Sequence, residues 1–234
     1  MKVWAVIPAA GVGTRMGADL PKQYLPLRGK TIIEHTLQRF VDHPRIDGVM
    51  VALAAHDEVW PTLEISKHPK IHRTAGGRER CHSVLNALKA LAWNSSFIDW
   101  ALVHDAARPC LRRADIDCML DAVVDHPVGG ILALPVRDTM KRADENNTIT
   151  ETIDRTGMWH ALTPQMFRIG PLASAIESAL AQGVNVTDEA QAMELSGQWP
   201  LLVEGHADNI KVTRPQDLVL AEIYLRYQEE TACA

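Results

Sequence analysis

Short apolar runs rich in β-branched residues alternate with helix-like segments through the first 136 residues of the chain. The apolar runs cover residues 3–7, 49–54, 101–103 and 131–136. Continuous runs of this kind are typical of central strands in a parallel sheet that is covered on both faces. Between them, apolar residues recur at every third or fourth position within 33–41, 84–91 and 116–123, which predicts amphipathic helices. This order predicts an α/β fold with a doubly wound, mostly parallel, Rossmann-like sheet.

Residues 137–160 interrupt the alternation and predict a β-arm. The run Asp144–Asn147 is a turn signal between two polar, threonine-rich stretches. These stretches have little apolar surface to bury, and an isolated two-stranded hairpin is marginally stable at best. We therefore expect the arm to project from the sheet and to form the contact of a homodimer. The alternative is a solvated excursion of the same domain.

The remainder of the chain returns to regular patterns. Helices are expected over 172–180 and 190–195, a last strand pair over 201–203 and 210–212, and an amphipathic helix at the C-terminus. The 234 residues contain no internal repeat and no long linker. Their number suits one domain with a substantial core, so residues 1–234 are expected to form a single domain.

Composition and charge exclude several classes of protein. Hydrophobic residues make up 47% and charged residues 23% of the chain, as in globular proteins. A net charge of −5 gives no electrostatic case for a nucleic-acid partner. The sequence contains neither an apolar run long enough for a membrane span nor a signal peptide, so we expect a cytoplasmic protein without a membrane partner. The four cysteines and ten histidines show no metal-binding spacing, which favours buried, reduced thiols.

A glycine-rich loop after the first strand is the strongest chemical signal. Residues 8–17 read PAAGVGTRMG, and residues 21–24 read PKQY. Glycines let backbone N–H groups approach an anion, while Arg15 and Lys22 supply two positive charges. Met16 occupies the third glycine position of the dinucleotide fingerprint, and the loop does not end in Gly-Lys-Ser/Thr. The pattern predicts a different phosphate-binding loop, partly disordered without nucleotide. An ordinary strand-to-helix turn is the alternative.

A second polar run, His104-Asp105-Ala106, also follows an apolar strand. Ligands of doubly wound sheets bind at the carboxyl ends of the strands, so this run and the glycine-rich loop are expected to share one site. A carboxylate such as Asp105 can contact a ribose hydroxyl or Mg²⁺. A strand-end aspartate bonded to the following turn is the alternative.

Five later segments extend the glycine-rich loop into a family pattern. They cover residues 76–84, 103–109, 159–165, 187–190 and 209–213. The loop alone is similar to that of sugar-nucleotide pyrophosphorylases and cytidylyltransferases. All the segments in this order resemble the 2-C-methyl-D-erythritol 4-phosphate cytidylyltransferase family, and the match spans nearly the whole chain.

The resemblance implies a reaction and its partners. It implies transfer of CMP from CTP to 2-C-methyl-D-erythritol 4-phosphate, with release of pyrophosphate, in the non-mevalonate isoprenoid pathway. It also implies a Mg²⁺ cofactor and a homodimer. Two alternatives are a cytidylyltransferase for another polyol phosphate, such as ribitol 5-phosphate, and a non-catalytic nucleotide-binding module.

The resemblance further implies roles for individual residues. Arg15 and Lys22 would stabilise the transition state, and Asp105 would contact the metal. The expected nucleotide contacts are Ala9, Ala10, Gly11, Gly13, Gly77, Ser83, Asp105 and Ala106. The expected contacts to the acceptor substrate are Thr139, Arg155, Thr163 and Lys211, with Arg155 on the arm and able to reach a partner's site.

Some of these residues have structural alternatives. Ser83 could serve as a first-turn helix residue that bonds to backbone, and the Thr187-Asp188-Glu189 run is also a good helix N-cap. Arg155 and Lys211 could be exposed charges. Arg78 departs from the pattern of the family, which carries an acidic residue beside the cytosine.

Overall fold

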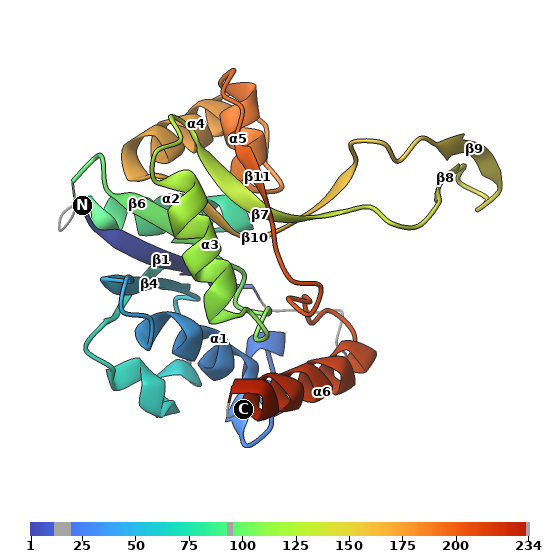
Figure 1. The fold of residues 1–234 in the computed structure, drawn as a ribbon. Helices are drawn as coiled ribbons and strands as arrows, with labels where there is room; N and C mark the ends of the chain where they lie inside the picture. Colours follow the sequence, from blue (N-terminus) through green and yellow to red (C-terminus); the bar gives the residue numbers. More distant parts are fainter. Residues whose placement is uncertain (12–19, 93–95, 233–234) are drawn as a thin grey trace.

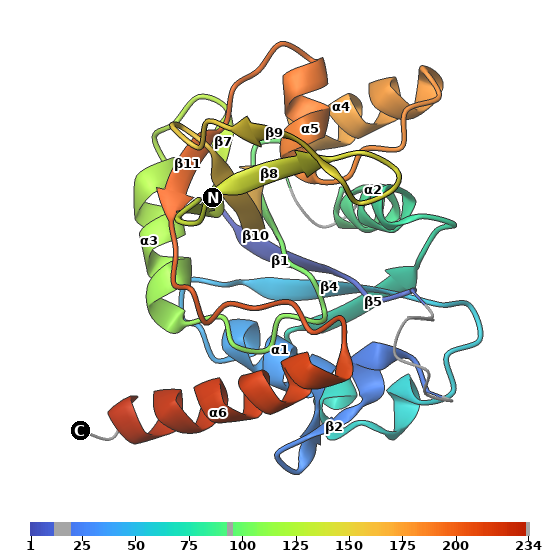
Figure 2. The ribbon, with the colours of Figure 1, turned by 90° about the vertical axis from the view of Figure 1, so that its right-hand side faces the viewer.

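A computed structural model of the chain describes residues 1–11, 20–92 and 96–232. Seven strands form the central sheet in the order β11-β7-β10-β6-β1-β4-β5, with helices over both faces (Figures 1 and 2). The pairs β5–β4, β4–β1, β1–β6 and β7–β11 are parallel, whereas β10 runs antiparallel to both of its neighbours. The predicted doubly wound, mostly parallel α/β sheet is confirmed.

Most of the predicted strands and helices are present, whereas β5 and β10 were not predicted. The sheet strands are β1 (Val3–Pro8), β4 (Gly48–Leu53), β5 (Ile71–Ala75), β6 (Trp100–Val103), β7 (Gly129–Pro135), β10 (Trp159–Arg168) and β11 (Leu201–Glu204). The helices are α1 (Ile32–Val41), α2 (Arg80–Leu91), α3 (Arg113–Val123), α4 (Ile169–Ala181), α5 (Glu189–Leu195) and α6 (Pro215–Ala232). Small elements are η2 (Lys22–Tyr24), β2 (Pro26–Leu27), β3 (Lys30–Thr31), η3 (Trp60–Thr62), η4 (Glu64–Lys67), β8 (Met140–Ala143) and β9 (Ile149–Ile153).

The alternating faces of β1 explain why its sequence is apolar throughout. Val3, Ala5 and Ile7 pack into a core with apolar residues of α1 and α3. Trp4 and Val6 point the other way, into a core formed with α2, α4 and α5. Burial of one aliphatic side chain contributes about 1.5–3 kcal/mol, so this two-faced burial fixes the central strand and the loop that follows it.

The strand β10 joins the arm to the sheet. Its first residues, Trp159–Ala161, are exposed and pair with the end of β7, and its last residues lie between β6 and β7. The register shifts between Ala161 and Gln165, so the intervening residues bulge out of the ladder. The sequence pattern did not predict this strand within the sheet.

The arm itself is a two-stranded sheet of β8 and β9 that extends beyond the body of the molecule (Figure 1). The predicted turn closes it: the backbone N–H of Asp144 donates to Thr148 O at 3.0 Å, and Asn147 has a φ of 61°. The projecting β-arm is therefore confirmed.

Three expectations need correction or fall outside the described residues. Residues 210–212 form no strand; Val212 N donates to Ala107 O at 2.8 Å, and its side chain is buried with α6. Cys81 and Cys110 are buried as expected, but Cys118 is exposed on α3. Partial disorder was expected for the loop from Gly11 to Lys22, of which residues 12–19 lie outside the described residues, as does Cys233. In the parts of the chain that the structure describes, no helix has the length and apolar character of a bilayer span.

Candidate functional site

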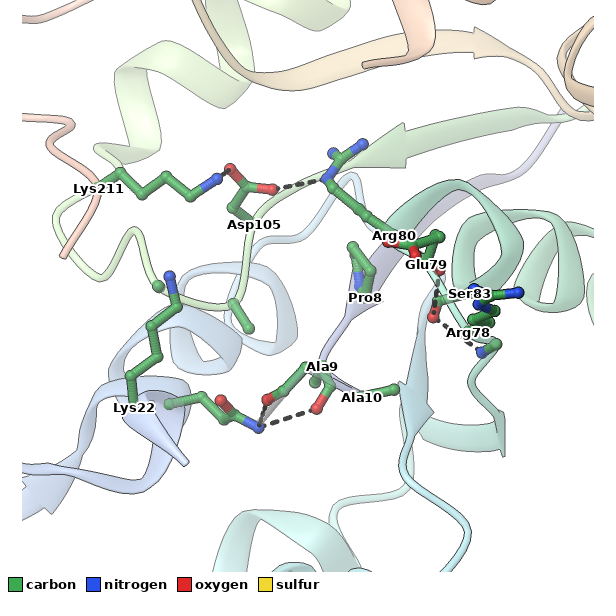
Figure 3. A pocket seen from close by; sticks show the side chains of 15 residues that line it. Pro8, Ala9, Ala10, Lys22, Arg78, Glu79, Arg80, Ser83, Asp105 and Lys211 are labelled. Carbon is green, nitrogen blue, oxygen red and sulfur yellow. Dashed lines mark hydrogen bonds and ion pairs between the residues drawn. The ribbon is translucent and has the colours of Figure 1, made fainter. Parts of the chain in front are cut away.

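A cavity of about 250 Å³ lies at the carboxyl ends of β1 and β6. Figure 3 shows residues from both strand ends facing it, together with residues of the 76–83 segment and Lys211. Nine of the predicted site residues line it, namely Ala9, Ala10, Gly11, Lys22, Gly77, Ser83, Asp105, Ala106 and Lys211. The glycine-rich loop and the run at the end of β6 therefore line one cavity, at the edge of the sheet where the topology places ligands.

The short helix η2 presents Lys22 to this cavity, and its neighbours fix η2 in place. Gln23 is buried, and its side-chain amide donates to Ala9 O at 2.9 Å and to Gly11 O at 3.2 Å. Tyr24 donates its hydroxyl hydrogen to Asp57 at 2.6 Å. The Lys22 ammonium donates to Val212 O at 3.4 Å. Gln23, which the sequence reasoning left unassigned, thus ties the lysine-bearing turn to the glycine-rich loop.

The turn that precedes α2 forms another wall of the cavity. Ser83 Oγ accepts from Gly77 N–H at 2.9 Å and donates to Glu79 O at 3.2 Å, so the hydroxyl holds the turn closed. This is the backbone-bonding alternative for Ser83, and its contact with a pyrimidine stays a prediction. Arg78 is exposed at the rim of the same cavity.

Asp105 lies at the centre of the charged side of the cavity. Its carboxylate pairs with Lys211 Nζ at 2.8 Å, Arg80 Nε at 3.0 Å and Arg108 Nε at 3.6 Å. Burial alone would raise the pKa of Asp105, but Arg80, Lys211 and Arg108 hold it well below its usual range. Asp105 is therefore ionised at neutral pH, and its charge is more than balanced by these cations.

Thr163 supports Asp105 from behind. The bulge in β10 brings its hydroxyl to 3.2 Å from the backbone N–H of Asp105 and 3.0 Å from His104 Nδ1. The Thr163 carbonyl accepts from the side-chain amide of Asn209 at 2.8 Å, next to the segment that carries Lys211. Thr163 is 5% exposed and is not among the residues that line the cavity.

The remaining predicted residues lie elsewhere. Thr139 and Arg155 are exposed on the arm, where Arg155 donates to Arg137 O, and neither lines the cavity. Gly13 and Arg15 lie outside the described residues. Asp188 is the N-cap of α5, accepting from Gln191 N–H at 3.0 Å, which confirms the capping interpretation of that run.

Two carboxylate residues, Glu79 and Asp105, line the cavity, and Asp105 is the one predicted to contact a divalent cation. Within residues 1–11, 20–92 and 96–232, no group of three or more His, Cys, Asp or Glu side chains could hold a metal ion. Mg²⁺ commonly takes one or two carboxylates and completes its shell with substrate phosphates and water. Asp105 supplies one such carboxylate, which in this structure pairs with Lys211, whose side chain is 39% exposed.

Comparisons with known proteins agree on one family. The sequence profile described as 2-C-methyl-D-erythritol 4-phosphate cytidylyltransferase matches residues 3–227. A protein of that name from Pseudomonas putida strain GB-1 is 58% identical over 216 residues, which is 92% of either chain. Another from Vibrio vulnificus strain CMCP6 is 54% identical over 226 residues, covering 97% of this chain and 95% of the relative.

Solved structures give the same result. The crystal structure of 2-C-methyl-D-erythritol 4-phosphate cytidylyltransferase from Francisella tularensis superimposes with a TM-score of 0.84 at 37% identity, covering 96% of this chain and all of that one. A structure titled 4-diphosphocytidyl-2C-methyl-D-erythritol synthase has a TM-score of 0.84 at 36% identity, over 96% of this chain and 99% of the other. The similarity therefore includes the arm and the cavity and is not restricted to one motif.

Proposed function

The chain belongs to the 2-C-methyl-D-erythritol 4-phosphate cytidylyltransferase family, and from this membership we propose how its cavity carries out the reaction. The enzyme transfers CMP from CTP to 2-C-methyl-D-erythritol 4-phosphate in isoprenoid biosynthesis. The products are 4-diphosphocytidyl-2-C-methyl-D-erythritol and pyrophosphate. The observation that carries the mechanism is the convergence of Lys22, Lys211 and a glycine-containing loop on one cavity.

CTP lies across this cavity with its base and its phosphates at different ends. Figure 3 shows Lys22 and Lys211 on one side and the turn with Arg78 and Ser83 on the other. The base occupies the Ser83 side, where backbone groups of the turn are held in fixed positions. The triphosphate occupies the side with the lysines, because cations and the backbone N–H groups of the loop favour anions there.

The chemical step needs positioning and charge neutralisation more than proton transfer. An oxygen of the acceptor phosphate attacks the α-phosphorus of CTP, and the bond from that phosphorus to the bridging oxygen breaks as pyrophosphate leaves. A phosphate monoester is already largely dianionic at neutral pH, since its second pKa is about 6. Lys22 and Arg15 stabilise the charge on the pentacoordinate phosphorus, and Lys211 binds the acceptor phosphate.

Mg²⁺ is the divalent cation of this proposal, with Asp105 as its carboxylate contact. When bound, the ion neutralises part of the triphosphate charge. Asp105 also lies next to Ala106, within reach of the ribose side of a nucleotide in this orientation. Thr163 keeps the backbone of Asp105 in place for either contact.

The arm completes the site in a homodimer. Arg155 and Thr139 are exposed on the arm, away from the cavity of their own chain, and both carry groups that bind a phosphate. In the proposed dimer, the arm of one protomer brings these two residues to the acceptor side of the partner's cavity. A second copy would also cover the exposed β8–β9 hairpin, because an isolated two-stranded hairpin is marginally stable at best.

Pyrophosphate release with CTP and Mg²⁺ tests the proposal directly. Parallel reactions receive 2-C-methyl-D-erythritol 4-phosphate or ribitol 5-phosphate, and the Lys22→Met variant serves as the inactive control. We expect release with 2-C-methyl-D-erythritol 4-phosphate alone. Pyrophosphate release with ribitol 5-phosphate alone would overturn the assignment of the acceptor. No release with either acceptor would overturn the assignment of a catalytic function.

A further inference from the structure

Glu189 is a buried side chain that pairs with Arg80, a residue lining the cavity. It is 1% exposed, and its two oxygens accept hydrogen bonds from Arg80 Nη1 at 2.7 Å and Arg80 Nη2 at 3.0 Å. This bidentate geometry fixes the plane of the guanidinium as well as its position. Arg80 lines the cavity, so the first residue of α5 holds a side chain of the site.

Neighbouring hydrogen bonds hold the start of α5 rigidly against β10. Gln165 accepts from Ala190 N–H at 2.9 Å and donates to Asp188 at 2.9 Å, and Gln165 itself is 1% exposed. Asp188 caps the same helix. Glu189 is therefore anchored by a strand of the central sheet and provides a fixed reference point for Arg80.

Arg80 transmits this fixed position to Asp105. Its third nitrogen, Nε, donates to Asp105 Oδ1 at 3.0 Å, so all three guanidinium nitrogens are engaged. The other Asp105 oxygen pairs with Lys211, whose side chain is 39% exposed against 26% for Arg80. An anionic substrate can draw Lys211 away, but Arg80 remains bound to Glu189 and continues to hold Asp105.

We propose that Glu189 is a positioning residue for nucleotide binding, acting through Arg80 to hold Asp105 in its binding orientation after Lys211 has moved to substrate. This inference rests on the proposed function, because it takes Asp105 as a nucleotide contact. Stability alone does not explain the pair. Buried ion pairs can often be replaced by apolar residues of similar volume without loss of stability. A fixed arginine side chain is needed to hold a carboxylate in position in a cavity that binds anionic substrates.

A double-mutant cycle with CTP as the probe tests this relay. The dissociation constant of CTP, with Mg²⁺ present, is measured by calorimetry on wild type, Glu189→Gln, Arg80→Gln and the double variant. In Glu189→Gln the amide NH₂ faces a guanidinium N–H, so Arg80 must shift. We expect each single variant to weaken CTP binding about tenfold and the double variant to show about the same tenfold loss, since both act through one contact.

Two outcomes would overturn the inference. One is a double variant that multiplies the two losses to about a hundredfold, because the residues would then act independently. The other is CTP binding by the double variant as tight as that of wild type. The double variant removes both charges together, so it avoids a lone buried charge if a single variant fails to fold.

A matched control separates positioning from loss of stability. Asp115 is another buried carboxylate, 1% exposed, and it accepts a hydrogen bond from His206 Nδ1 at 2.7 Å. Neither residue lines the cavity. Asp115→Asn should lower the melting temperature without changing the CTP dissociation constant. Wild-type activity with CTP and 2-C-methyl-D-erythritol 4-phosphate is measured in parallel, and its absence would reject the proposed function. If the wild type is active but Glu189→Gln binds CTP as tightly as wild type, only the positioning role of Glu189 is rejected.

Discussion

Gly76 packs so closely on Ala10 that a Cβ atom added to Gly76 would lie 2.2 Å from the Ala10 Cβ. Such a contact requires one of the two segments to move, because Ala10 has no flexible side chain to displace. Ala10 lies in the loop after β1, and Gly76 begins the turn that Ser83 closes. The absence of a side chain at Gly76 therefore allows these two walls of the cavity to pack directly against each other.

Gly76→Ala should separate these walls and weaken CTP binding. We expect the KM for CTP to rise about tenfold or more, with a loss of stability of about 1–3 kcal/mol from overpacking. Steady-state kinetics and urea unfolding measure the two effects. Gly205→Ala is the matched control, since its added Cβ would meet Leu132 at 3.4 Å, an ordinary contact distance. If Gly76→Ala and Gly205→Ala have the same KM for CTP and the same stability, the close-packing argument is contradicted.

Lys22 and Arg15 should each be required for the chemical step. Removal of one such electrostatic group typically lowers kcat by about 10²–10³-fold, which we expect for Lys22→Met and for Arg15→Ala. Single-turnover kinetics with saturating CTP separate this loss from weaker binding. Lys67→Met, which removes an exposed lysine paired with Glu64, should keep wild-type activity. Variants of Lys22 and Arg15 with activity within a few-fold of wild type would remove them from the mechanism.

Mixed dimers can show whether Arg155 serves its own cavity or that of its partner. Arg155→Ala and Lys22→Met protomers are each expected to be nearly inactive alone. If Arg155 acts across the dimer, each mixed dimer keeps one intact site, and random exchange restores about a quarter of the wild-type activity. If Arg155 acts within its own chain, mixing restores no activity. Sedimentation of the mixture establishes that dimers have formed.

His104 should make the stability of the protein depend on pH. Burial lowers the pKa of His104 to about 4, below the 6.5 of an exposed histidine. As the pH falls from about 6.5 to about 4, the unfolded chain takes up a proton that the native state excludes. The free energy of unfolding therefore decreases across this window, by up to about 3 kcal/mol from this group, and changes no further below it.

Urea unfolding at about pH 7 and about pH 5 measures this effect against a His104→Asn variant. The variant should lose less stability than wild type over the same interval. Burial also lowers the pKa values of His35 and His43, but both residues are present in the two proteins, so their contributions cancel. An equal loss in the two proteins would show that His104 does not carry the dependence.

The strands and helices that the sequence predicted correctly are those whose burial shows in their composition. β6 is buried along its whole length and β1 at every residue except Pro8, and their apolar runs mark them clearly. β5 was missed because it reads IHRTA and lies at the edge of the sheet, where polar residues are tolerated. Residues 210–212 are apolar enough for a strand, but Asn209 and Val212 bond to Thr163 and Ala107 instead of a neighbouring strand.

The charged groups of the site were predictable only in part. Lys22 and Asp105 belong to runs at strand ends, and topology brings such runs together. Arg80 and Glu189 are 109 residues apart in the sequence, and no local pattern indicates that they pair. Thr163 was assigned to substrate, but the β10 bulge that places it behind Asp105 has no signature in a single sequence.

The continuity of β10 sets a limit on protein engineering. One strand carries the base of the arm at Trp159 and the supports of the cavity at Thr163 and Gln165. An internal deletion that removes the arm to produce a monomer must therefore end before Trp159, because the pairing of β10 with Pro135 of β7 begins there. A cut further along the strand would release both supports, and loss of activity in such a shortened protein would say nothing about whether the reaction requires two subunits.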